Sequence, residues 1–236
     1  MSIAKKIDNY ISQSSWIRKM FEEGITLKKQ YGAENVFDFS IGNPNVAPPH
    51  AFIEALIDVA KKEIPNKHGY MPNAGYLEVR EVLAKQISVD SGVSIFPNNI
   101  VMTCGAGGAL NVILKTLLDD GDEVVILSPF FVEYKFYISN YSGVTIVAKT
   151  NNDFSLNIEN IGNAINQKTK AILINSPNNP TGRIYDADSI IQLSHLLKVK
   201  SEEYKKAIYL ISDEPYAEIV FDDITERVRR DQVKPE

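Results

Sequence analysis

The sequence contains a single cysteine, Cys104, and this scarcity excludes both an internal disulfide and a thiolate metal cluster. Its histidines, His50, His68 and His195, do not follow the spacing of metal ligands, so we expect no metal site. No uninterrupted apolar run approaches the length that crosses a membrane, and residues 1–10 lack the apolar stretch of a secretory signal. We therefore expect a cytoplasmic protein.

An excess of positive charge is also lacking. The formal net charge is −5 at pH 7 and no basic stripe is visible, which argues against nucleic acid as a partner. Hydrophobic residues make up 44% of the 236 positions, and this is ample apolar content for one large α/β domain or for one and a half ordinary domains.

Two polar segments each follow a short apolar run. Residues 175–182 (Asn-Ser-Pro-Asn-Asn-Pro-Thr-Gly) come after 171–174, and residues 212–216 (Ser-Asp-Glu-Pro-Tyr) come after 208–211. Such short apolar runs are typical of buried parallel strands. Both polar segments are therefore expected at the carboxyl ends of strands, which is where open α/β sheets bind ligands.

The polar segments bring together an amide, a carboxylate and a phenol, at Asn179, Asp213 and Tyr216. These groups suit a heteroaromatic ring that carries a hydroxyl and a basic nitrogen. Each segment taken alone is better explained as a local turn or cap, because Asn, Pro and Gly form turns for local reasons. The combination resembles the class I/II aminotransferases, which are fold-type I pyridoxal-phosphate enzymes, in the order and spacing of the Asn-Pro-Thr-Gly and Asp-x-x-Tyr motifs. The resemblance covers residues 10–223.

A glycine-rich segment at 104–110 lies between an expected strand at 100–103 and an expected helix that runs to Leu118. Glycines at this place let backbone N–H groups and the helix dipole approach a phosphate. The glycine spacing fits neither a dinucleotide fingerprint nor a Walker loop. The resemblance implies that Ala106 and Gly107 donate their backbone amides to the phosphate of pyridoxal 5'-phosphate.

The resemblance also implies that Phe131 stacks on the pyridine ring, that Asn179 and Tyr216 bond the ring hydroxyl, and that Asp213 holds the ring nitrogen protonated. It further implies that Tyr70 reaches the cofactor phosphate of the partner subunit in a homodimer, and that Gly42 lies beside the substrate carboxylate. From the residues alone, Gly42 is about equally well explained as an ordinary turn glycine. Without the resemblance, Tyr70 is interpreted as a packed loop aromatic, and core packing is the alternative for Phe131.

The alternation of apolar runs and helical patterns from residue 100 onward predicts an α/β fold with a mainly parallel, helix-covered sheet. Strands are expected at 36–40, 100–103, 124–127, 144–147, 171–174 and 208–211. Helices are expected from the capping Ser14 and Ser15 to before Gly32, from Pro48 to before Pro65, over 77–87, from the glycine-rich segment to Leu118, opening within 128–134, and over 158–165 and 186–197. By resemblance, residues 1–47 form an N-terminal arm and part of a small domain, and 48–223 form the incomplete large domain of fold type I. Residues 224–236 are highly charged and aperiodic, so we expect a disordered tail.

The family's Ser-x-x-Lys motif, whose lysine holds the cofactor, has no counterpart after Asp223. Lys234 precedes a proline and has no serine at the required spacing, so we assign no catalytic residue. The resemblance implies an aminotransferase, and we expect this chain to be a fragment without turnover. A β-lyase of the same fold, or a cofactor- or partner-binding remnant without catalysis, remains an alternative. In the resembled fold, strands that follow Asp213 fill the middle of the sheet, so we expect 100–103 to be unpaired and an open apolar edge beside 171–174.

Overall fold

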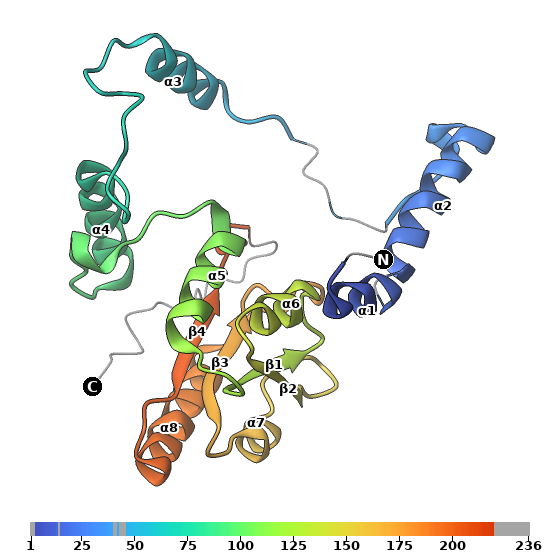
Figure 1. The fold of residues 1–236 in the computed structure, drawn as a ribbon, viewed down its shortest axis with the longest axis vertical. Coiled ribbons are helices and arrows are strands. Elements are labelled where there is room, and N and C mark those ends of the chain that lie inside the picture. Colours follow the sequence, from blue (N-terminus) through green and yellow to red (C-terminus); the bar gives the residue numbers. More distant parts are fainter. Residues whose placement is uncertain (1–2, 14, 40–41, 43–45, 220–236) are drawn as a thin grey trace. The chain divides into compact units, whose positions relative to one another are not determined.

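The computed structural model describes residues 3–13, 15–39, 42 and 46–219, and the chain divides into two compact units, Met1–Gly69 and Tyr70–Glu236 (Figure 1). This division falls later than the boundary at residue 47 that the sequence suggested between the arm and the large domain. The arm and domain assignment stays a prediction. The expected tail, 224–236, lies outside the described residues.

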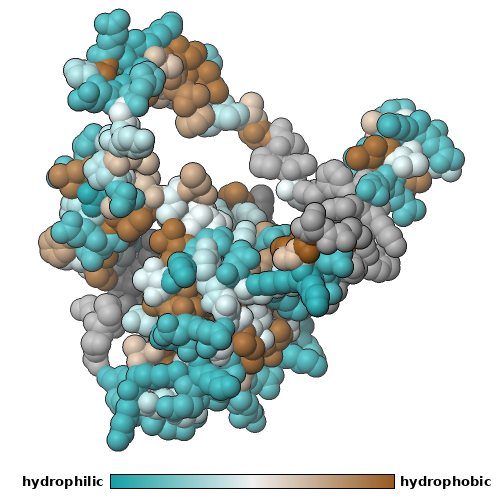
Figure 2. Space-filling model, viewed as in Figure 1, coloured by the Kyte–Doolittle hydropathy of each residue, from teal (hydrophilic) through white to brown (hydrophobic). Residues whose placement is uncertain are grey.

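The first unit contains helices and irregular segments: α1 (Lys5–Gln13), α2 (Ser15–Tyr31), the short 3-10 helix η1 (Ala33–Asn35) and α3 (His50–Lys61). The expected helices over 15–31 and after Pro49 are confirmed, although α3 ends at Lys61, before Pro65. No residue of α3 is buried, and its apolar side chains gather on an exposed face that Figure 2 shows in brown. This helix therefore adds no buried core to the first unit.

The strand expected at 36–40 is wrong for its described part, because residues 36–39 are irregular. Phe37 is 82% exposed and Phe39 is 92% exposed, so the alternation of apolar side chains meets no core. A strand requires a hydrogen-bonded neighbour, and the described residues supply none here. Asp38 instead makes a 2.7 Å ion pair with Lys28 of α2.

The second unit is built around a four-stranded parallel sheet with the order β2-β1-β3-β4 (Figure 1). Its strands are β1 (Glu123–Ser128), β2 (Val144–Lys149), β3 (Thr169–Asn175) and β4 (Tyr209–Asp213). Each matches an expected apolar run. The predicted parallel α/β fold is therefore confirmed, and all the strands present their carboxyl ends to one edge.

Helices cover both faces of this sheet: α5 (Gly105–Leu117) and α6 (Glu133–Asn140) on one face, and α7 (Ile158–Ala164) and α8 (Ala187–Tyr204) on the other. Alternate side chains of a strand point to opposite faces, so Val124 and Ile126 pack with α5 and α6, while Val125 and Leu127 pack with α7 and α8. The remaining elements are α4 (Leu77–Ser91) and η2 (Pro97–Asn99). No helix among the described residues is long and apolar enough to span a membrane.

Two expectations about the sheet need correction. Residues 100–103 do not form a strand, although they lie unpaired with the sheet as expected; the backbone N–H of Met102 bonds the carbonyl of Ala74 instead. The edge beside 171–174 is not open, because β4 pairs with β3 along its length, from Ala171 opposite Tyr209 to Asn175 opposite Asp213. Among the described strands, the two edges of the sheet are β2 and β4.

Candidate functional site

A cavity of about 90 Å³ lies at the carboxyl edge of the sheet. Its lining comes from α5, from α6 and the segment before it, and from the segments after β3 and β4: Ala106, Gly107, Leu110, Phe131, Tyr134, Tyr137, Asn175, Asn179, Asp213, Pro215 and Tyr216. Every cofactor residue predicted from the sequence except Tyr70 belongs to this lining. Parallel strands bring these distant segments together because their carboxyl ends share one edge.

The wall contributed by α5 is the N-terminus of that helix. Its first residue, Gly105, has a φ of +69°, which favours glycine, and Ala106 and Gly107 follow in the first turn. The first N–H groups of a helix have no acceptor within the helix and carry the positive end of its dipole. A Cβ on Gly107 would lie 3.1 Å from the hydroxyl of Tyr137, so this position has little room for a side chain. The wall is therefore suited to an anionic group.

Asp213 also lines the cavity, at the end of β4. Its side chain is 8% exposed, and its Oδ2 accepts a 2.6 Å hydrogen bond from the Tyr134 hydroxyl. Burial, first, and then the hydrogen bond to Asp213 raise the pKa of Tyr134 far above its ordinary value. Tyr134 therefore keeps its proton and serves as a permanent donor to the carboxylate.

Asn175, which is 3% exposed, connects the two strand ends at the cavity. Its Nδ2 donates to the backbone oxygen of Asp213 at 2.8 Å, and its Oδ1 accepts from the backbone N–H of Asn179 at 2.6 Å. One side chain therefore holds both Asp213 and Asn179 in place.

The segment that presents Asn179 is a tight turn. Asn178 Oδ1 accepts from the Thr181 hydroxyl at 2.9 Å, and the Gly182 N–H bonds the Asn178 carbonyl at 2.7 Å. Gly182 has a φ of +71°, which explains the glycine. The motif therefore does form a turn, and the same turn places Asn179 at the cavity.

The aromatic side of the cavity is formed by Phe131 and two tyrosines of α6. The rings of Phe131 and Tyr134 meet edge to face, with centroids 5.5 Å apart. Burial, followed by the charges of Glu133 and Asp213, raises the pKa of Tyr137. Sequence reasoning missed Tyr134, Tyr137 and Asn175. The spacing of three residues between Tyr134 and Tyr137 was a usable signal, because it puts these two rings on one face of α6.

Neither Tyr70 nor Gly42 is among the residues that line the cavity. Tyr70 is fully exposed and does not line it. Gly42 is an exposed residue of the first unit, with no atom within 4 Å of the place where its Cβ would be. Their assigned contacts, to a partner subunit and to the substrate, stay predictions.

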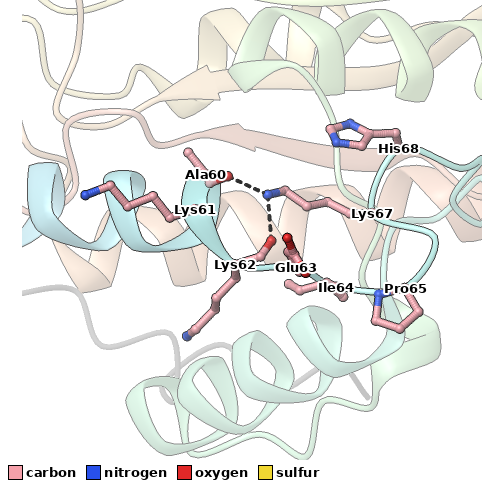
Figure 3. A pocket seen from close by; sticks show the side chains of 8 residues that line it. All are labelled: Ala60, Lys61, Lys62, Glu63, Ile64, Pro65, Lys67 and His68. Atoms are coloured by element: carbon pink, nitrogen blue, oxygen red, sulfur yellow. Dashed lines mark hydrogen bonds between the residues drawn. The ribbon is translucent and has the colours of Figure 1, made fainter.

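A second hollow, of about 580 Å³, lies in the first unit at the end of α3 (Figure 3). Its lining is one short segment, residues 60–68, and contains no predicted site residue. The Lys67 ammonium donates to the carbonyls of Ala60 and Lys62 at 2.7 and 2.9 Å, as the dashed lines in Figure 3 mark. Lysine commonly caps the free carbonyls of a helix end, so this hollow is explained by helix capping.

Comparison with known proteins agrees with the motifs. Residues 34–236 match the family described as aminotransferase class I and II. The probable aspartate aminotransferase of Methanocaldococcus jannaschii is 35% identical over 186 residues, which cover 78% of this chain and 47% of that protein. The probable aspartate/prephenate aminotransferase of Aquifex aeolicus is 34% identical over 191 residues, or 80% of this chain and 46% of that protein.

Solved structures agree with the fold. An amino transferase from Eubacterium rectale superposes with a TM-score of 0.88 at 33% identity, over 95% of this chain and 57% of that one. Aspartate aminotransferase from Thermus thermophilus gives 0.78 at 29% identity, over 93% of this chain and 55% of that one. The chain spans about half the length of the curated relatives it matches. The resemblance found in the motifs is confirmed: the chain belongs to the class I and II aminotransferase family, whose members use pyridoxal phosphate.

Proposed function

We propose that this chain is the cofactor-binding part of a pyridoxal-phosphate-dependent aminotransferase, which moves an amino group from an amino acid to a 2-oxo acid. The observation that carries the proposal is the convergence of a buried carboxylate, an amide, a phenol, an aromatic ring and a helix N-terminus on one cavity. The cofactor has an anionic phosphate and a ring with a basic nitrogen, and the cavity offers a helix N-terminus for the first and a carboxylate for the second.

The residues present fit the cofactor in their chemistry. The first turn of α5, where Gly107 leaves little room for a side chain, suits the phosphate. The buried carboxylate of Asp213 suits a protonated ring nitrogen, because an opposite charge favours the charged form. When bound, pyridoxal phosphate supplies an electron sink for negative charge at the substrate carbon.

The other lining residues would orient the ring. Asn179 and Tyr216 offer an amide and a phenol to the ring hydroxyl, and Phe131 offers a face for stacking. The edge-to-face contact with Tyr134 holds the Phe131 ring, so this face is available without reorganisation. Tyr70 is proposed to bond the cofactor phosphate of a partner subunit, and Gly42 to contact the substrate carboxylate.

Turnover is a separate matter from binding. The sequence contains no Ser-x-x-Lys after Asp223, so we propose that a polypeptide of these 236 residues binds the cofactor without transferring amino groups. Relatives are named as aspartate or aspartate/prephenate aminotransferases, which makes aspartate the first amino acid to test with a longer chain. We further propose a cytoplasmic homodimer as the state of the complete enzyme.

The test is a calorimetric titration of the 236-residue chain with pyridoxamine 5'-phosphate. This probe has no aldehyde and therefore forms no adducts with surface lysines. We expect saturable binding that Asp213→Ala weakens, because the variant loses a charge-assisted contact. Asp188→Ala, an exposed position on α8, is the control and should match the parent chain. Superimposable titrations of Asp213→Ala and the parent would refute the role of Asp213, and no binding by the parent would refute the function.

A further inference from the structure

Tyr137 of α6 lines the cavity with a hydroxyl that makes no hydrogen bond to another described residue. The neighbouring polar side chains are engaged: Tyr134 donates to Asp213, and Asn175 bonds the backbones of Asp213 and Asn179. Tyr137 is half-buried, so its hydroxyl is held at the cavity and still faces open space. The hydroxyl is therefore an unused donor in the candidate site.

This hydroxyl lies against the first turn of α5. Its Oη is 3.1 Å, and the ring carbon Cζ is 3.7 Å, from the place where a Cβ of Gly107 would be. Because glycine has no side chain, the hydroxyl stands in the space that a side chain at position 107 would enter. It is thus beside the helix N-terminus whose N–H groups suit an anionic group.

The packing of α5 against α6 maintains this juxtaposition. Leu110 and Leu114 of α5 share one buried core with Ile138 of α6, the residue directly after Tyr137. Leu114 and Ile138 are fully buried, so the two helices have little freedom to move apart. The hydroxyl is therefore placed before any ligand arrives.

We propose that the Tyr137 hydroxyl donates a hydrogen bond to the phosphate of the cofactor, next to the backbone amides at the start of α5. This inference rests on the proposed function. It adds a side-chain donor from α6 to a phosphate site that the sequence assigned to the backbone of α5 alone. A hydroxyl that donates to a charged phosphate oxygen makes a charge-assisted bond, which is stronger than a bond between neutral groups.

The protonation of Tyr137 agrees with this role. Burial, and then the charges of Glu133 and Asp213, raise its pKa, so the phenol keeps its proton. A protonated phenol can donate to a phosphate, whereas a phenolate would repel it.

The experiment titrates the 236-residue chain and Tyr137→Phe with pyridoxamine 5'-phosphate by calorimetry. We expect the variant to bind about tenfold more weakly, which is the scale of one hydrogen bond to a charged group. Phosphorus NMR at saturating ligand should show the resonance of the bound phosphate at a different position in the variant, because one donor to that phosphate is gone. Tyr141→Phe is the matched control, since Tyr141 is half-buried directly after α6 and does not line the cavity; it should reproduce both parent values.

A substitution on the other side of the contact gives a second reading. Gly107→Ser puts a Cβ 3.1 Å from the Tyr137 hydroxyl, so it should weaken binding in the parent chain. In Tyr137→Phe the hydroxyl is absent and the ring carbon lies at an ordinary contact distance of 3.7 Å, so the same serine should weaken binding less.

Several results would overturn the inference. Unchanged affinity in Tyr137→Phe would show that the hydroxyl is not used, and weaker binding with an unmoved phosphorus resonance would show that it acts away from the phosphate. Equal costs of Gly107→Ser in both chains, or a circular dichroism spectrum showing that Tyr137→Phe no longer folds, would also refute it. Failure of the parent chain to bind the ligand is a different outcome, because it refutes the proposed function itself.

Discussion

Asn175 offers a direct test of how the site is held together, because one buried amide joins the ends of β3 and β4. Asn175→Ala removes the donor to the Asp213 carbonyl and the acceptor for the Asn179 N–H. Leaving a buried polar group unpaired costs about 1–3 kcal/mol. Asp213 is 8% exposed and should incur the full cost, whereas Asn179 is half-buried and water can partly replace its lost partner. We expect a loss of about 2–4 kcal/mol of unfolding free energy, a large share of the 5–15 kcal/mol typical of a domain.

The assay is urea denaturation followed by circular dichroism, with the midpoint and slope fitted for each variant. Asn160→Ala is the matched control: its Nδ2 also donates to a strand carbonyl, that of Lys149 at 3.0 Å, but the bond is exposed. The control should lose about 0.5 kcal/mol or less. If Asn175→Ala loses no more than Asn160→Ala, the amide does not connect the strands and the reasoning is wrong.

Two further predictions concern the second unit. Asp186 caps α8 by accepting a hydrogen bond from the Ser189 N–H at 2.8 Å, and this bond lowers the pKa of Asp186. The stability that the cap contributes is therefore present above the ordinary carboxyl pKa and is lost as pH falls through the lowered pKa. Asp186→Ala should therefore lower the free energy of unfolding by about 1 kcal/mol at neutral pH. In acid, the urea midpoints of the variant and the parent chain should move closer together, and a constant difference between them would contradict this prediction. Tyr209→Lys, on the exposed edge strand β4, should lower light scattering by the chain because a charged edge resists pairing with another edge. Ile191→Lys on α8 adds the same charge elsewhere, and an equal effect there would refute the role of the edge.

The sheet could be predicted because the composition of each apolar run by itself indicates a buried strand. The runs at 124–127 and 171–174 are short and wholly apolar, and both are fully buried between helices. Their composition therefore indicates burial on both faces of the sheet. Parallel pairing then follows from the helices between the strands. Once the strands are parallel, Asn179 and Asp213 must end at one edge, and their meeting required no knowledge of their contacts.

The segments at 36–40 and 100–103 show where this reasoning stops. Both alternate or repeat apolar residues as strands do, yet neither is a strand over its described residues. Strand formation belongs to a pair of segments, and the preference measured for one segment is mostly packing against its neighbours. Val101 is 55% exposed and Phe39 is 92% exposed, so the neighbours that would make strands of them are missing from the described residues. The sequence of one segment cannot show whether such neighbours are present.

The contacts that complete the site were harder to predict for a related reason. Tyr134 and Asp213 are 79 residues apart, and only the packing of α6 on the sheet decides which face of that helix meets the carboxylate. A chemical requirement nevertheless narrows the search. A carboxylate at the end of a buried strand must find a donor, because a buried charge without a hydrogen bond is too costly to retain. Few donors lie close in sequence to Phe131, the residue predicted to stack on the cofactor, and Tyr134 is the nearest phenol in the sequence. Asking what satisfies the buried carboxylate would therefore have made Tyr134 one of a few candidate donors, and only the packing of α6 decides among them.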